Sequence, residues 1–83
     1  MKLNIYYKKG KEEISKTYND TDVFGEFIRQ YHLLKSINAE FTLSIISDDD
    51  VLVKLNYTND VFMYAINKTS TPHHKAHYLQ EYI

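Results

Sequence analysis

The chain has 83 residues, of which 43% are hydrophobic, and it contains eight tyrosines, four phenylalanines and no cysteine. We expect a single domain over residues 1–83, because this length supplies one small core, and the apolar content argues against a disordered chain. Without cysteine the fold depends on apolar packing alone. A formal charge of −1 argues against both a strongly basic nucleic-acid binder and a polyanionic mimic.

The chain shows neither a membrane span nor a secretion signal, which predicts a cytoplasmic protein. Its longest apolar run, residues 61–66, is far shorter than the ~20 residues needed to cross a bilayer. The first residues lack the apolar middle region of a signal peptide. Residues with AT-rich codons, such as Lys, Asn, Ile and Tyr, are frequent, whereas Gly and Pro number two and one. This bias and the short chain predict an accessory protein of a phage or mobile element.

A β-hairpin is predicted at the start of the chain. Apolar residues alternate with polar ones over the first eight positions, at Leu3, Ile5 and Tyr7. This period of two is typical of a half-buried strand. Gly10 can adopt a positive φ and therefore favours a turn. With Lys9 and Gly10 as a two-residue loop, Ile5 is expected opposite Ile14.

A helix is predicted from about residue 22 to Ser36. The segment 19–22 supplies candidates for the N-cap. One broad apolar stripe follows at helical spacing and contains Val23, Phe24, Phe27, Ile28, Tyr31 and Leu34. Leu33 lies off this stripe and is expected to be exposed. Gly25 weakens the helix, so we expect a close approach to another element there.

The second half of the chain predicts a three-stranded meander. Apolar alternation marks three stretches, 41–45, 53–57 and 62–66. A three-residue loop at 48–50 and a two-residue turn at 59–60 place nine large apolar side chains on one face, including Phe41. The predicted cross-strand pairs are Ile45–Val53, Leu43–Leu55, Tyr57–Phe62, Leu55–Tyr64 and Val53–Ile66.

These elements define an α+β fold with a mostly antiparallel sheet. The predicted order is two strands, a helix, three strands and a final amphipathic helix over residues 73–82, preceded by Pro72. A weak similarity between residues 18–24 and 57–62 leaves an alternative open. The alternative has two ββα repeats plus a C-terminal helix, with a short helix over 61–67. We prefer the meander because its register uses nine residues.

The second face of the meander is the predicted partner-binding surface. It carries more apolar residues than a freely solvated face should. Either the final helix covers it, or another molecule binds there with the help of tyrosines, which suit interfaces. The residues assigned to partner binding are Ile46, Leu52, Val61, Met63, Tyr78 and Tyr82. With no catalytic motif, we expect no enzyme and no cofactor, but a protein-binding domain that inhibits or adapts a host protein.

Two other functions remain open from the sequence. Tyr6, Lys8, Lys9 and Lys11 form a basic and aromatic group on the first hairpin, where single-stranded nucleic acid could stack and pair. Lysines near a hairpin also protect an edge strand from pairing, and this reading is favoured. The third hypothesis is a structural component that associates with itself as a homo-oligomer.

The acidic and histidine clusters are expected to be solvated rather than metal-binding. His73, His77 and Glu81 share one face of the predicted final helix at i, i+4 and i+8. A structural zinc site normally needs four ligands, so these three are only weak metal candidates. The aspartates at 48–50 lack the alternating oxygens and central glycine of a calcium loop. No metal or cofactor is therefore predicted.

Overall fold

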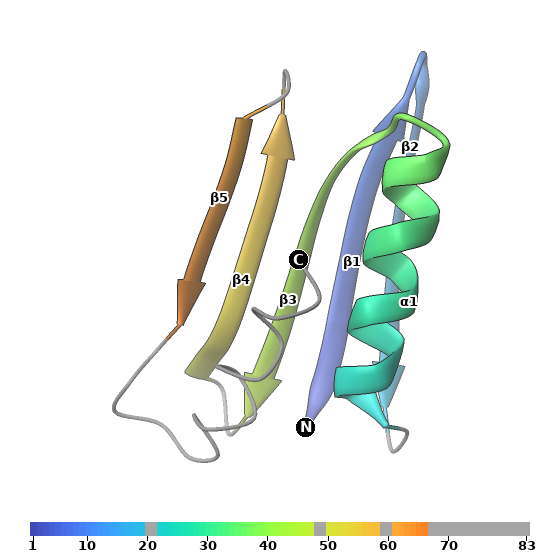
Figure 1. The fold of residues 1–83 in the computed structure, drawn as a ribbon. Helices are drawn as coiled ribbons and strands as arrows, with labels where there is room; N and C mark the ends of the chain where they lie inside the picture. Colours follow the sequence, from blue (N-terminus) through green and yellow to red (C-terminus); the bar gives the residue numbers. More distant parts are fainter. Residues whose placement is uncertain (20–21, 48–49, 59–60, 67–83) are drawn as a thin grey trace.

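The computed structural model describes residues 1–19, 22–47, 50–58 and 61–66, with residues 50 and 61–66 described by their backbone. This part of the chain forms an antiparallel sheet of five strands with the spatial order β2-β1-β3-β4-β5, and one helix that packs against it (Figure 1). The elements are β1 (Lys2–Lys9), β2 (Glu12–Asn19), α1 (Val23–Ser36), β3 (Glu40–Ser47), β4 (Asp50–Thr58) and β5 (Val61–Ile66).

The predicted α+β class and its antiparallel sheet are confirmed. The alternative with two ββα repeats is wrong, because residues 61–66 form a strand that pairs with β4. Apolar side chains at alternate positions can face one side of a strand but not one side of a helix, so the meander register prevails over the local similarity. The predicted final helix over 73–82 lies outside the described residues, and the predicted order is therefore matched only in part.

The first hairpin forms, but its register differs from the prediction. Lys9 pairs with Glu12, so the two-residue loop is Gly10-Lys11, and Ile5 lies opposite Lys16 instead of Ile14. Gly10 has φ +62°, whereas Lys11 is not among the residues with positive φ. A type II′ turn needs glycine at its first central position, and this requirement sets the loop one residue later than expected. The shift of two residues along β2 leaves each side chain on its predicted face.

The predicted pairs between β3, β4 and β5 are confirmed up to Ile45, where the register changes. Ile45 pairs with Val53, but Ile46 pairs with Val51, so Leu52 is an extra residue in β4. The three-residue loop at 48–50 is wrong, since Asp50 already pairs with Ser47 as part of β4. The extra residue is a β-bulge, which lets the strand change which side chains face the core.

Helix α1 has well-defined caps at both ends. The Asp22 carboxylate accepts a hydrogen bond from the Gly25 backbone N–H at 3.1 Å, as an N-cap residue does. At the other end, Asn38 adopts φ +59°, and the N–H of Ala39 donates to the carbonyl of Leu34 at 3.1 Å. The N–H of Asn38 donates to the carbonyl of Lys35, also at 3.1 Å, and these two C-terminal bonds form a Schellman motif that turns the chain sharply into β3.

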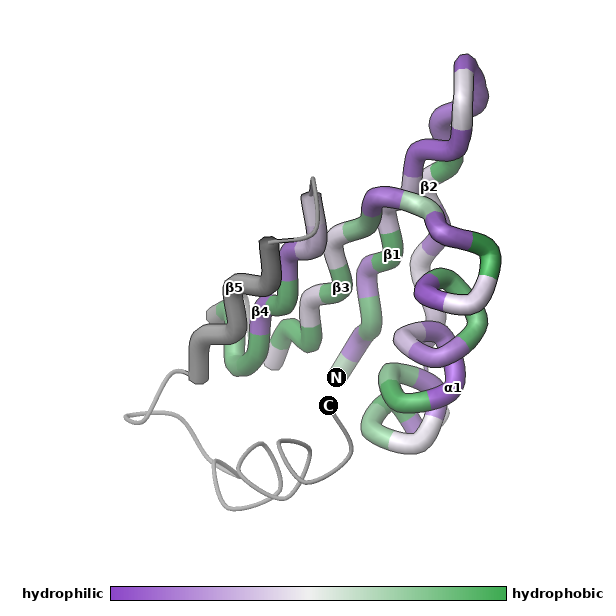
Figure 2. Tube along the Cα trace, turned by 45° about the horizontal axis from the view of Figure 1, so that its top comes forward, coloured by the Kyte–Doolittle hydropathy of each residue, from purple (hydrophilic) through white to green (hydrophobic). Residues whose placement is uncertain are grey.

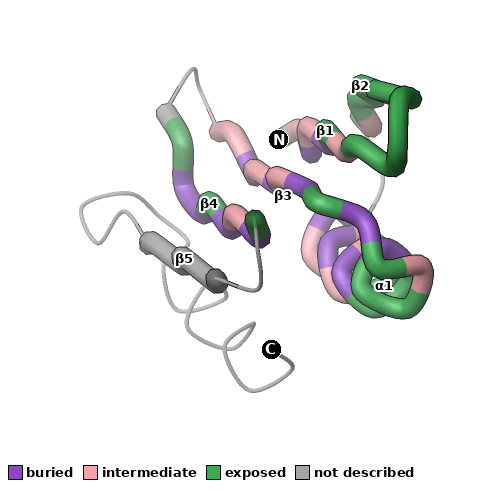
Figure 3. The backbone as a smooth tube through the Cα atoms, turned by 90° about the horizontal axis from the view of Figure 1, so that it is seen from above, coloured by how far each residue is buried: buried purple, intermediate pink, exposed green. Residues whose placement is uncertain are grey.

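The core lies between α1 and the sheet face that it covers. Buried residues recur at every second position of β1, β3 and β4, and α1 packs against β1 and β3 (Figure 3). The tube coloured by hydropathy shows the matching alternation along these strands, and a hydrophilic tip on the first hairpin (Figure 2). Leu33 is exposed, as predicted. The helix contributes Val23, Phe27, Tyr31 and Leu34, and the sheet contributes Leu3, Ile5, Phe41, Leu43, Ile45, Leu52, Val53, Leu55 and Tyr57.

Gly25 has a different role from the predicted one. A Cβ at this position would lie 2.6 Å from Oδ2 of Asp22. The close approach is therefore to the capping carboxylate of its own helix and not to another element. Glycine at this position leaves space for the N-cap side chain.

Candidate functional site

The sheet face opposite α1 is the candidate binding surface, which we name the open face. Among the described elements, none covers it. Because β1 lies between β2 and β3, side chains from both hairpins meet there in continuous cross-strand rows. Its centre forms a shallow hollow of about 330 Å³, and most of its lining residues carry hydroxyl or amide groups. The lining residues are Asn4, Ile5, Tyr6, Ser15, Lys16, Thr17, Thr42 and Ser44.

Hydrogen bonds between neighbouring strands hold the polar side chains of the open face in position. Thr17 donates from its hydroxyl to the amide oxygen of Asn4, directly opposite on β1, at 3.0 Å. In the same way Thr42 donates to the amide oxygen of Asn56 on β4 at 2.6 Å. Such cross-strand pairs reduce the freedom of exposed side chains. The open face is therefore partly preorganised.

Tyr6 is the one large aromatic side chain described on the open face, and 39% of it is exposed. Desolvation raises the pKa of its hydroxyl, and the carboxylates of Glu13 and Glu40 raise it further. Both carboxylates belong to residues opposite Lys8, one on each neighbouring strand. One end of the open face is thus a row of alternating charge, Glu13, Lys8 and Glu40, while the next row, Ser15, Tyr6, Thr42 and Asn56, carries no charge.

Two of the predicted partner-binding residues, Ile46 and Leu52, have described side chains, and these lie on opposite faces of the sheet. Ile46 is half-buried on the open face, as expected. Leu52, in contrast, is fully buried in the core, so its assignment to the surface is wrong. The bulge causes this difference, because Leu52 and Val53 both face the core opposite Ile45. Val51 takes the place of Leu52 opposite Ile46, with 44% of its surface exposed.

The other predicted partner-binding residues are placed only by the backbone or not at all. Val61 and Met63 lie on β5 opposite Thr58 and Asn56, at register positions that continue the open face. Tyr78 and Tyr82 lie outside the described residues. The open face is accordingly more polar at its centre than the sequence predicted.

The four residues of the nucleic-acid hypothesis do not form one surface. Tyr6 and Lys8 belong to the open face, whereas Lys9 lies on the other face and donates a hydrogen bond from Nζ to the carbonyl oxygen of Ile37. Lys11 lies in the turn. Carboxylates beside Tyr6 and Lys8 would repel a phosphate backbone, whose attraction to cations supplies most of nucleic-acid affinity.

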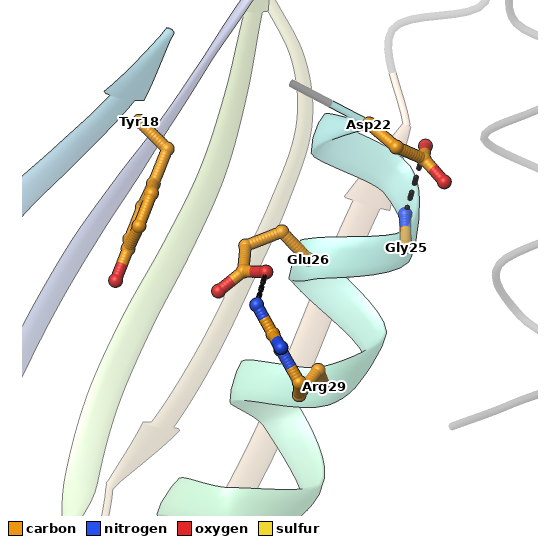
Figure 4. A pocket seen from close by; sticks show the side chains of 5 residues that line it. All are labelled: Tyr18, Asp22, Gly25, Glu26 and Arg29. Carbon is orange, nitrogen blue, oxygen red and sulfur yellow. Dashed lines mark hydrogen bonds and ion pairs between the residues drawn. The ribbon is translucent and has the colours of Figure 1, made fainter.

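A second hollow, of about 450 Å³, lies where the end of β2 faces the first turns of α1. Its lining residues are Tyr18, Asp22, Gly25, Glu26 and Arg29 (Figure 4). The Glu26 carboxylate accepts hydrogen bonds from Gln30, at 3.0 Å, and from Arg29. The same bonds, from Gln30 first, lower the pKa of Glu26. Because these polar groups bind one another, the hollow offers a ligand few free partners.

The weak metal candidates His73, His77 and Glu81 lie outside the described residues. Within the part of the chain that the structure describes, no group of three His, Cys, Asp or Glu side chains is arranged to hold a metal ion. None of the described helical residues forms a helix long and apolar enough to cross a membrane.

Sequence reasoning missed the contribution of Asn4, Ser15 and Thr17 to the open face. Their alternation with apolar residues was visible, but only the sheet order brings the first hairpin beside Thr42 and Ser44.

No protein-family model, curated protein or solved structure matches this chain. The surfaces of the described residues therefore carry the information on function.

Proposed function

We propose that the chain is a non-catalytic protein-binding domain and that the open face is its recognition surface. The observation that carries this proposal is the centre of this face, which no described element covers and where Tyr6 stands exposed among hydroxyl and amide side chains. Tyrosine, serine and asparagine dominate antibody binding sites for the same physical reasons. A rigid amphipathic ring supplies contact area at a small entropic cost, while short polar groups adapt their hydrogen bonds.

The electrostatics of the open face support a protein partner over a polyanion. Burying hydroxyl and amide groups against a partner costs less free energy than burying charges, provided that hydrogen bonds replace the lost water. The charges near Tyr6 alternate along a single row at one end. A row of this kind suits the polar rim of an interface, where charges set orientation more than affinity.

Photo-cross-linking tests this proposal. A benzophenone amino acid replaces Tyr6 in one sample and His32, which is exposed on α1, in the matched control. We expect a discrete protein from a lysate of the source cells to cross-link through position 6 and not through position 32. The captured protein is then purified, and its affinity is measured by calorimetry against the unmodified chain and two variants.

The variants distinguish recognition by the open face from general adhesion. Tyr6→Ala removes the central ring and should weaken binding at least about tenfold, as expected for an aromatic hot spot. Arg29→Ala, on the opposite side of the molecule, should leave affinity unchanged. Equal cross-linking from both positions, or equal affinity of both variants, would contradict the proposal. Low-salt gel shifts with single-stranded DNA and RNA test the nucleic-acid alternative, and we expect no retardation.

A further inference from the structure

Strand β2 forms one border of the sheet and has a free edge. It pairs with β1 on one side, and no other described strand lies beside it (Figure 3). Of its eight residues, all except Ile14 and Tyr18 are exposed. An edge strand carries unpaired backbone N–H and C=O groups and can pair with another strand, although charged side chains on the edge oppose pairing unless opposite charges lie across from them. The free edge is therefore an interaction surface distinct from the open face.

The turn of the first hairpin determines which backbone groups of β2 point outward. A two-residue turn closes on a hydrogen-bonded pair, which here is Lys9 with Glu12. Hydrogen-bonded and non-hydrogen-bonded pairs alternate along an antiparallel ladder. The N–H and C=O groups of Glu13, Ser15 and Thr17 consequently point away from β1, so an added strand has to pair with these residues.

We propose that the free edge of β2 binds the β2 edge of a second copy of this chain, antiparallel, about a two-fold axis at Ile14. In this register Glu13 of each copy exchanges backbone hydrogen bonds with Ser15 of the other. The two Ile14 side chains meet at a non-hydrogen-bonded position, where side chains lie closest. The arrangement extends the sheet across both copies by strand addition.

Charge complementarity selects this register. About Ile14, Glu12 of each copy lies opposite Lys16 of the other, which gives two pairs of opposite charge beside a central apolar contact. A two-fold axis at Glu13 would place two glutamates opposite each other, and an axis at Lys16 would do the same with two lysines. Like charges directly opposite each other destabilise a sheet. An axis at Ser15 would instead place Lys16 opposite the apolar Ile14.

The contact should be reversible, because one strand from each copy buries less surface than a stable interface does. Sedimentation of the whole chain over a concentration series, from micromolar to millimolar, measures it. We expect the mass to rise from 9.9 kDa toward twice that value. A mass that stays at 9.9 kDa at every concentration overturns the proposal. It does so even if β2 is found to bind a different protein.

Charge exchange tests the register. Glu12→Lys places lysine opposite lysine, and Lys16→Glu places glutamate opposite glutamate, so each variant alone should remain at the monomer mass. An equal mixture of the two variants restores both pairs of opposite charge and should recover the dimer mass. Association of each single variant as strong as that of the original chain, or a mixture that stays monomeric, overturns the proposal.

A backbone variant provides an independent test. Ser15→Pro removes an N–H that points outward, so it blocks the added strand but no hydrogen bond to β1. We expect this variant to remain monomeric with an unchanged far-ultraviolet circular dichroism spectrum. His32→Ala, at an exposed position on α1, is the control and should associate like the original chain. A Ser15→Pro variant that is folded and still dimeric would show that another surface makes the contact.

Discussion

Replacing Leu52 by alanine should destabilise the protein much more than replacing its neighbour Val51. Leu52 is 0% exposed at the bulge of β4, whereas Val51 is 44% exposed on the open face. The leucine substitution removes three buried carbons, worth about 2 kcal/mol in transfer free energy at ~0.8 kcal/mol each. The cavity left behind adds about 1 kcal/mol. The free energy of unfolding should therefore fall by about 3 kcal/mol.

Urea denaturation followed by circular dichroism measures this difference. With a slope of about 1 kcal/mol per molar urea for a chain of this size, Leu52→Ala should move the midpoint down by ~3 M. Val51→Ala should move it by less than about 1 M, because exposed substitutions rarely exceed 0.5 kcal/mol or so. A shift for Leu52→Ala that is no larger than the shift for Val51→Ala would refute the bulge, since uninterrupted pairing would leave Leu52 on the open face and turn Val51 toward the core.

Three further predictions concern two glycines and one titrating group. Gly10→Ala should lower the free energy of unfolding by about 1 kcal/mol in the same urea assay, because φ is +62° there and no atom lies within 4 Å to add a steric cost. Gly25→Ala should be nearly neutral in this assay, because its gain in helix propensity is offset by displacement of the Asp22 cap. Glu13→Gln should lower the pKa of Tyr6 toward its usual value in an NMR titration of the ring. Since the folded state raises this pKa, the contribution of Tyr6 to stability is present below pH ~10 and is lost as the pH rises through the folded pKa. An unchanged pKa of Tyr6 in the Glu13→Gln variant would contradict the assigned effect of the carboxylate.

Local patterns in the sequence predict the described strands and the helix. Alternation of apolar residues predicted the strands, and the helical stripe with its acidic start predicted α1. The register between β3, β4 and β5 followed from the same alternation, because a slip of one residue would turn every apolar side chain away from the core. The pattern is less accurate for burial on α1, since Glu26 lies outside the predicted apolar stripe but is half-buried and bonded to Gln30.

The sequence by itself thus determined the described elements, the α+β class and the face that each side chain takes in regular strands. The tertiary structure decided the rest, for physical reasons that local patterns do not contain. The positive φ of Gly10 sets the hairpin loop, and the bulge at Leu52 moves this side chain into the core. Pairing of β1 with β3 joins two hairpins that are separated in sequence by α1. Only this long-range pairing places Tyr6 among hydroxyl and amide side chains from both hairpins and leaves β2 at the border of the described sheet.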